Sequence, residues 1–461
     1  MKMAFKRETG NFVFGRRSRA LSPTKVISLA FVTIILLGTM LLMLPAASRS
    51  GESCGFRPAL FTATSATCVT GLVLYDTWTQ WSGFGQTVII LLIEIGGLGF
   101  MSAASLLIFL FRKKVGLKQR LVMAQALSLT DMEDVVKLQK VVLFGSIGVQ
   151  SLGTLVLFVR FLPQFGWEKA LRWGIFHSVS AFCNAGFDIF GCMKSGSSLM
   201  VFNTDPVVLL TLSVLVIVGG LGFFVWQEAI TVRQFRKFSV YTKLVLLTTG
   251  ALLFGGTVCF CALEWNNPDT LGPMGVGEKL LNGFFQSVTV RTAGFAAIDQ
   301  AKLTEASKAI AMVLMLIGGA SGSTAGGVKT VTMVVLVLFI AARARGRDSV
   351  NVFNRTIPNT QVLDSMTIVS ILTGMAIFGS VFICVTSPVS FVDAAFESVS
   401  ALATVGITAG VTPVLSVAAQ YMIILFMYFG RVGVLTISLG FLMGNKAQER
   451  FRYAQTNLLI G

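Results

Sequence analysis

The chain has 461 residues, of which 54% are hydrophobic and only 13% are charged. A soluble protein carries about twice that charged fraction, so the composition indicates an integral membrane protein. The formal net charge of +16 alone would allow a nucleic-acid binder. About two thirds of the Lys and Arg residues, however, fall on the predicted side of both termini, which is the positive-inside bias that sets membrane topology. We therefore expect a lipid bilayer, and no nucleic acid, as a partner.

Apolar segments of about 20 residues, the length that an α-helix needs to cross a membrane, recur along the chain. They predict an all-α polytopic membrane protein with eight transmembrane helices. A basic tail leads directly into the first segment, so no cleavable signal peptide is expected and both termini are predicted to be cytoplasmic. The predicted spans are 26–44, 88–111, 141–159, 207–225, 244–261, 310–341, 368–385 and 422–443.

Between the two spans of each successive pair lies a variant of one motif. It predicts an amphipathic helix of about two turns that starts at Phe and leads into a Gly nine or ten residues later. The four glycines follow one another at intervals of 115, 108 and 112 residues, which predicts four covalently linked helix–pore loop–helix repeats around a central pore. The repeats are expected at 26–115, 116–235, 236–345 and 346–445, between cytoplasmic tails at 1–25 and 446–461.

A loop whose backbone carbonyls are held in place by a Gly can replace the water shell of a large monovalent cation such as K+. No acidic residue stands beside any of the four glycines, so main-chain carbonyls of 67–71, 182–186, 290–294 and 402–406 are the expected ligands. The candidate filter residues are Val69, Thr70, Gly71, Asn184, Ala185, Gly186, Thr292, Ala293, Gly294, Thr404, Val405 and Gly406.

The sixth predicted span is too long for one straight crossing and is interrupted by Gly318–Gly327, in which five of ten residues are Gly. Such a run does not hold a helix, and irregular backbone survives at membrane depth only where protein covers it or it lines a water-filled cavity. A flexible segment below the filter is therefore a candidate gate. A phosphate-binding P-loop is not expected, because Val328 displaces the Lys and no strand precedes the motif.

A Gly-Gly motif recurs in the second span of each repeat and allows close helix packing. In the fourth repeat Arg431 stands where the others have Gly97, Gly220 and Gly319. An Arg at the bilayer centre costs about 2.5 kcal/mol or more, so it normally has a role. Two interpretations remain open: a cation that faces the pore below the filter, or a buried ion pair with Glu94. The candidate gate residues are Gly318, Gly319, Ala320, Ser321, Gly322, Ser323, Thr324, Ala325, Gly326, Gly327, Lys329 and Arg431.

The sequence contains little that would support catalysis or a bound metal. Its seven Cys residues form no CxxC pair, and its one His, His177, has no ligand partner nearby, so neither a zinc site nor a redox site is expected. The predicted spans offer no Asp, Glu or His pairs of the kind that a membrane enzyme needs. A purely structural protein is disfavoured as well, because four glycine loops at membrane depth would then be costly without a use.

Together, the quartet of single-Gly loops, the Gly-Gly repeats, the glycine-rich break and Arg431 resemble the Trk/Ktr/HKT superfamily of potassium transporters. The resemblance covers essentially the whole chain and is strongest to the KtrB-type membrane subunit. It implies a K+ uptake protein of the bacterial plasma (inner) membrane, a homodimer with one pore per subunit, and frequent stimulation by Na+. It also implies a cytosolic RCK-type (KtrA-like) regulatory ring that senses ATP versus ADP, with no covalently bound cofactor in this chain.

The nearest alternative is a Trk-type K+ or Na+ transporter that acts without this ring. Such relatives usually carry two additional N-terminal spans, and their absence here favours the Ktr type. The loop that contains Gly294 is one residue shorter than the others and includes Arg291. We interpret Arg291 as an anchor of the loop. The inner connection 112–140 is the expected landing place of a cytosolic regulator, and the apolar end of the chain is expected to pack on a partner subunit.

Overall fold

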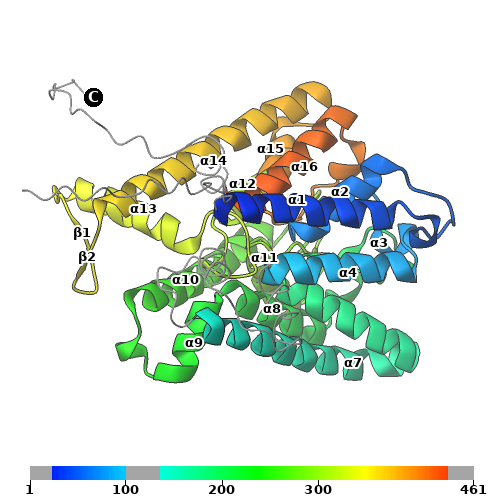
Figure 1. The fold of residues 1–461 in the computed structure, drawn as a ribbon, viewed down its shortest axis with the longest axis horizontal. Helices are drawn as coiled ribbons and strands as arrows, with labels where there is room; N and C mark the ends of the chain where they lie inside the picture. Colours follow the sequence, from blue (N-terminus) through cyan, green and yellow to red (C-terminus); the bar gives the residue numbers. More distant parts are fainter. Residues whose placement is uncertain (1–22, 100–134, 434–461) are drawn as a thin grey trace, which may run out of the picture.

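The computed structural model describes residues 23–99 and 135–433, which form a bundle of α-helices (Figure 1). The expected all-α class is thereby confirmed. Most helices run roughly parallel to the long axis of the molecule, and one short hairpin projects from the end of the bundle. Several predicted segments lie wholly or largely outside the described residues: the two tails, most of the connection 112–140, and the later parts of the spans 88–111 and 422–443.

Each expected repeat contributes a first apolar helix, a buried helix that leads into the loop with the predicted filter glycine, and a second apolar helix, which is broken in the second and third repeats. In chain order the main helices are α1 (Pro23–Leu42), α2 (Phe56–Thr67), α4 (Gly83–Leu98), α7 (Val135–Phe182), α8 (Pro206–Gly220), α10 (Val240–Glu264), α11 (Val276–Thr289), α12 (Glu305–Leu316), α13 (Thr330–Ala344), α14 (Asn359–Thr386), α15 (Phe391–Leu402) and α16 (Val417–Val432).

Shorter elements connect these helices. They are α3 (Thr77–Gln80), α9 (Phe223–Val232), the antiparallel strands β1 (Val350–Val352) and β2 (Arg355–Ile357), and the 3-10 turns η1 (Pro45–Ala47), η2 (Phe190–Cys192), η3 (Ser198–Phe202), η4 (Phe235–Lys237) and η5 (Thr412–Val414).

Local sequence explains where many of these helices begin. A Ser, Thr or Asp stands just before the first turn, and its side chain accepts a hydrogen bond from a backbone N–H that has no partner within the helix. The capping residues are Ser82 for α4, Asp205 for α8, Ser239 for α10, Thr304 for α12, Ser390 for α15 and Ser416 for α16.

In the second repeat, the first span and the buried helix follow each other directly, joined by a kink within α7. The backbone of α7 breaks once, at Gly166, where φ is 74° and ψ is 169°. The arm that follows carries Phe176 and ends at Phe182. The buried helices α2, α11 and α15 have 12, 14 and 12 residues, so the expected two turns were an underestimate and about three to four turns is correct.

The second long helices do not cross as straight rods. The predicted span 207–225 is wrong as a single helix, because α8 and α9 meet at an angle of 92°. The bend lies at Gly222, whose φ of 90° an L-residue rarely adopts. The predicted break in the sixth span is present: α12 ends at Leu316 and α13 starts only at Thr330.

Length and composition support membrane crossing within the described part of the chain. Four helices are long and apolar enough to span a bilayer, and the bent pair α8–α9 would make a fifth. The apolar helices α4, α13 and α16 are shorter. The eight-span arrangement therefore stays a prediction.

Candidate functional site

The structure brings the four predicted loop glycines together in a ring. A Cβ added to Gly71 would lie 3.3 Å from the Cα of Gly186, and one added to Gly186 would lie 2.6 Å from the Cα of Gly294. A Cβ on Gly294 would lie 2.6 Å from the carbonyl oxygen of Val405, and one on Gly406 would lie 2.8 Å from the Cα of Gly71. Each loop thus contacts the next repeat in order, and the fourth closes on the first.

The backbone conformation repeats as well. All four glycines have positive φ, and so does the residue two positions before each of them. For residues with a Cβ this conformation is strained, and such strain persists only where the surroundings enforce it. All twelve candidate filter residues are buried. The non-glycine residues with positive φ in these loops are Val69 (57°), Asn184 (60°), Thr292 (70°) and Thr404 (51°).

A hydroxyl at the end of each buried helix braces its loop. In the first and fourth repeats the hydroxyl accepts a hydrogen bond from the glycine N–H. Ser65 Oγ accepts from Gly71 at 3.0 Å, and Ser400 Oγ accepts from Gly406 at 3.1 Å. The glycine backbone is therefore fixed by its own repeat as well as by its neighbour.

In the second and third repeats the equivalent hydroxyl donates instead. Ser180 Oγ donates to the carbonyl oxygen of Phe187 at 2.7 Å, and Thr289 Oγ1 donates to that of Phe295 at 2.6 Å. Our sequence analysis missed these four residues. The available signal was a Ser or Thr four residues after the Phe that opens each motif.

The recurring Gly-Gly motif has a specific packing role. In three repeats its first Gly lies directly against the last carbonyl of the buried helix from the same repeat, where no Cβ fits. The contacts are Gly96 with Thr67, Gly219 with Phe182, and Gly430 with Leu402. Close approach of this kind sets the second long helix immediately behind the loop.

The glycine-rich segment between α12 and α13 forms a loop with a closed base. Gly318 N–H donates to the carbonyl oxygen of Val328 at 2.9 Å, and Thr330 N–H donates to that of Gly319 at 3.0 Å. The ammonium of Lys329, two residues after this loop, donates to the carbonyl oxygen of Ala325 at 2.7 Å. We call residues 318–327 the glycine loop.

The second repeat holds one side of the glycine loop. Ala320 N–H donates to the carbonyl oxygen of Gly220 at 2.9 Å, at the end of α8. The hydroxyl of Thr324 donates to the carbonyl oxygen of Phe182 at 3.1 Å, where α7 leads into its candidate filter loop. On the fourth repeat, Gly326 lies against the Thr404 side chain so closely that no Cβ fits. The glycine loop therefore touches the bases of the candidate filter loops of the second and fourth repeats.

Arg431 connects the glycine loop to the first repeat. Its guanidinium donates to the carbonyl oxygens of Thr324, of Gly96 (2.5 Å) and of Gly97 (2.9 Å). The last two acceptors lie in the final turn of α4, where carbonyls lack partners within the helix and favour a cation. An ion pair between Arg431 and Glu94 is absent from the described residues, so that interpretation is wrong.

Glu94 has other partners. Its carboxylate accepts hydrogen bonds from Gln150 Nε2 at 2.9 Å and from Cys183 Sγ at 3.3 Å. These contacts connect α4 to α7, that is, the first expected repeat to the second. Our sequence analysis overlooked them, since no spacing in the chain places these three residues together.

A cavity of about 280 Å³ opens on the opposite side of the glycine ring from the glycine loop, and all four ring glycines line it. Three carboxylates from the first three repeats also line it: Asp76, Asp188 and Asp299. Burial, followed by the nearby charge of Asp76, raises the pKa of Asp188 to about 6. An acidic approach to the ring attracts cations. The feature was not predicted from the sequence, because only Asp76 and Asp299 share a spacing after the ring glycine, five residues, and Asp188 follows by two.

No candidate metal centre is found in the part of the chain that the structure describes. No group of three or more His, Cys, Asp and Glu side chains that could hold a metal occurs there. The single His has a structural role: His177 Nδ1 lies 2.8 Å from the carbonyl oxygen of Trp173, and its ring stacks on Phe190.

Comparison with known proteins gives consistent results. The family model described as TrkH, cation transport protein, matches residues 15–450. The potassium/sodium uptake protein NtpJ of Enterococcus hirae is 40% identical over 97% of this chain and 99% of its own length. The Ktr system potassium uptake protein B of Bacillus subtilis is 38% identical over 95% of this chain and 97% of its own length.

Among solved structures, the crystal structure of the potassium transporter TrkH from Vibrio parahaemolyticus has a TM-score of 0.71. The match covers 93% of this chain and 86% of that one, at 15% sequence identity, which shows a shared fold. These matches confirm the resemblance inferred from the motifs and the expectation that the protein is not an enzyme. The chain belongs to the TrkH family of cation transport proteins.

Proposed function

We propose that this chain is the ion-translocating subunit of a Ktr-type system that takes up K+ across the bacterial plasma membrane. The observation that carries the proposal is the closed ring formed by Gly71, Gly186, Gly294 and Gly406. Each of the four loops that contain them has the same strained backbone. The names of the relatives, which are potassium uptake and potassium/sodium uptake proteins, support K+ as the substrate and Na+ as a further candidate.

In this proposal the carbonyl oxygens of the twelve filter residues replace the water shell of K+. Backbone oxygens suit a large, weakly hydrated cation, whereas rings of carboxylates would suit other ions. The buried helices end at the filter loops, so the negative ends of their dipoles add to the attraction. The acidic cavity outside the ring would raise the local cation concentration before entry.

The glycine loop, with Lys329 and Arg431, is proposed to be the gate. Its contacts with the bases of the filter loops support a position below the filter. A loop held by single hydrogen bonds from several repeats can be released by small shifts of those repeats. The two cations are expected to raise the barrier for a cation while the gate is closed.

The assembly follows the family resemblance. We propose a homodimer with one pore per subunit, eight spans, and both termini in the cytoplasm. An RCK-type, KtrA-like ring is proposed to dock on the cytosolic face and to open the gate according to whether it holds ATP or ADP. ATP and ADP would therefore act only through the partner subunit.

Growth of a bacterium that lacks its own K+ uptake tests the function. The chain should restore growth at limiting K+, and co-expression of its cognate cytosolic subunit should strengthen the rescue. A Gly186→Ser variant, checked for membrane insertion, is the matched control and should rescue poorly. Failure of the well-inserted native chain to rescue, with or without the partner, would redirect the proposal to Na+.

The second candidate is a Trk-type K+ or Na+ transporter that acts without the ring. The name of the Enterococcus hirae relative, a potassium/sodium uptake protein, favours keeping it. Full rescue that is indifferent to any cytosolic partner, combined with comparable uptake of the two ions, would select this candidate.

A further inference from the structure

A buried arginine in the third filter loop, Arg291, has no acidic counter-ion among the described residues around it. The Arg291 side chain is only 8% exposed, and none of the described residues that line the small cavity beside it is acidic. Its Nη2 lies 3.5 Å from the carbonyl oxygen of Gly318, which is the outer limit of a hydrogen bond. Its Nε finds no partner among the residues that the structure describes. An unpartnered donor on a buried cation is costly and calls for an explanation.

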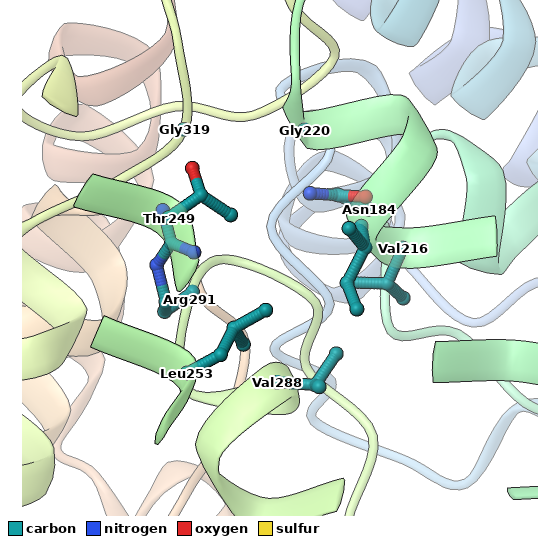
Figure 2. A pocket seen from close by; sticks show the side chains of 9 residues that line it. Asn184, Val216, Gly220, Thr249, Leu253, Val288, Arg291 and Gly319 are labelled. Carbon is teal, nitrogen blue, oxygen red and sulfur yellow. The ribbon is translucent and has the colours of Figure 1, made fainter. Parts of the chain in front are cut away.

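A water molecule in the cavity beside the guanidinium would explain the unpartnered Nε (Figure 2). It has a volume of about 20 Å³ and is lined by Arg291, Asn184, Thr249, Gly220 and Gly319, among others. This is enough for one water molecule, which needs a site of about 10–15 Å³ with polar partners. In Figure 2 the guanidinium points toward the Thr249 side chain and the backbone at Gly319.

The C-terminal ends of two helices balance the positive charge of Arg291. Gly220 ends α8, and Val288 lies in the last turn of α11; both line the cavity. Each helix C-terminus carries about half a negative charge, so together they can balance one guanidinium without a carboxylate. The same negative ends disfavour an anion in the cavity and favour a neutral water.

We propose that Arg291 is a positioning residue that links the third filter loop to the glycine loop. The link consists of the direct contact to Gly318 and of one water molecule, held in the cavity, that accepts from Nε. Gly318 also closes the base of the glycine loop through Val328, so a displacement of Arg291 shifts that base. The state of the filter and the state of the gate are thereby coupled. The coupling rests on the proposed gate, whereas the physical link does not.

Hydrogen exchange in lipid bilayers tests the link directly. In Arg291→Met, which removes both contacts, the amides of residues 318–330 should exchange about tenfold faster, as expected for loss of one charge-assisted hydrogen bond. Arg291→Lys keeps the positive charge but loses the planar guanidinium with its several N–H donors, so a smaller acceleration of hydrogen exchange is expected. Lys279→Gln is the matched control: Lys279 lies on α11, is also 8% exposed, and donates to the Trp265 carbonyl. Unchanged exchange in both Arg291 variants would overturn the proposal.

A double-mutant comparison of K+ flux tests the coupling. Arg291→Met should raise basal flux about tenfold when the glycine loop is intact, and less than twofold when residues 320–326 are deleted. Equal factors in the two backgrounds would show that Arg291 acts on the filter or on folding, and would overturn the coupling. If the deletion itself leaves flux unchanged while hydrogen exchange responds to Arg291→Met, the gate assignment fails and the link stands.

Discussion

At Gly406 two constraints meet that only glycine satisfies. Its φ is 87°, and a Cβ at this position would collide with the carbonyl oxygen of Thr70 in the neighbouring repeat. We expect Gly406→Ser to displace that carbonyl and to lower the selectivity for K+ over Na+ by about tenfold, a change of about 1.4 kcal/mol. Expression should be unaffected. Reversal potentials in mixed K+ and Na+ solutions measure the ratio.

Gly410→Ser is the matched control for this variant. Gly410 has nearly the same φ, 83°, but no atom lies within 4 Å of the added Cβ. The backbone strain is therefore similar, while the collision with a neighbouring carbonyl is absent. An equal loss of selectivity in both variants would count against the carbonyl ring as the selective element.

The carboxyl group of Asp188 predicts a pH dependence of K+ uptake. Its pKa is raised to about 6, mainly by burial and then by the charge of Asp76. Above pH 6 it is ionised and attracts K+ to the cavity, and below pH 6 it is neutral. We expect K+ uptake at low concentration to fall about twofold as external pH drops from 7 to 5. Uptake of labelled Rb+ at stepped external pH measures it.

Substitution separates this group from others. Asp188→Asn should flatten the profile between pH 5 and 7, whereas Asp269→Asn, at an exposed ion pair with Lys302, should leave it unchanged. A profile that persists in Asp188→Asn would assign the titration elsewhere. For stability the sign is opposite: because the folded state binds this proton more tightly, the contribution of Asp188 weakens as pH rises from about 4 to 6.

The residue-level features divide into those with a sequence signal and those without. The glycines recur at similar intervals, between 108 and 115 residues, so their assembly into a ring could be predicted. The bracing hydroxyls recur too, but Ser and Thr are common enough in helices that the pattern carried little weight. Asp76 and Asp299 each follow their ring glycine by five residues, but Asp188 follows by two and the fourth repeat has Val411 at the five-residue position. The spacing was therefore too irregular to signal the cavity in which the three carboxylates meet.

At the scale of elements, the glycine loop is the segment that we propose as the gate. Its base is closed by the hydrogen bond from Gly318 to Val328, and deletion of Ala320–Gly326 leaves both residues in place. The deletion removes the acceptor of Arg431 on Thr324 and the contact with Thr404. We expect basal K+ flux to rise at least tenfold in proteoliposomes without a partner subunit.

The deleted protein must remain folded for this result to count. Monodisperse elution and an unchanged helical circular dichroism spectrum are the checks, because no helix is shortened by the deletion. Flux equal to or below that of the native chain in such a sample would argue against a gate. Retained K+ selectivity would further show that the loop does not form the filter.

Elements were predictable where composition determined them. A run with five glycines in ten residues predicts a break in the helix, whereas a single glycine in an apolar helix does not. Hydropathy measures apolar length and is insensitive to backbone direction, so the breaks at Gly166 and Gly222 had no signal in the segment lengths. The same limitation left the partners of Arg431 open: charge alone suggested Glu94, but the free carbonyls at the end of α4 are the acceptors.

At the scale of the whole molecule, the outer surface fits a lipid environment. Large apolar side chains stay exposed on the long helices, for example Phe254 at 75% and Val385 at 80%. A soluble protein of this size would cover such groups or use them for binding. In a bilayer they contact lipid, so the bundle is stabilised by its polar contacts between repeats and by close packing around glycines.

Orientation in the membrane follows from the charge distribution and can be measured with a native cysteine. The positive-inside bias predicts that the cavity with its three carboxylates faces the outside. Cys192, which is exposed on η2, lies in the loop that follows the second ring glycine, on the side of that cavity. A membrane-impermeant maleimide should therefore label the protein in intact cells, and Cys192→Ser should remove most of the label. Labelling confined to inside-out vesicles would reverse the topology, and with it the assignment of the acidic cavity as the entrance for uptake.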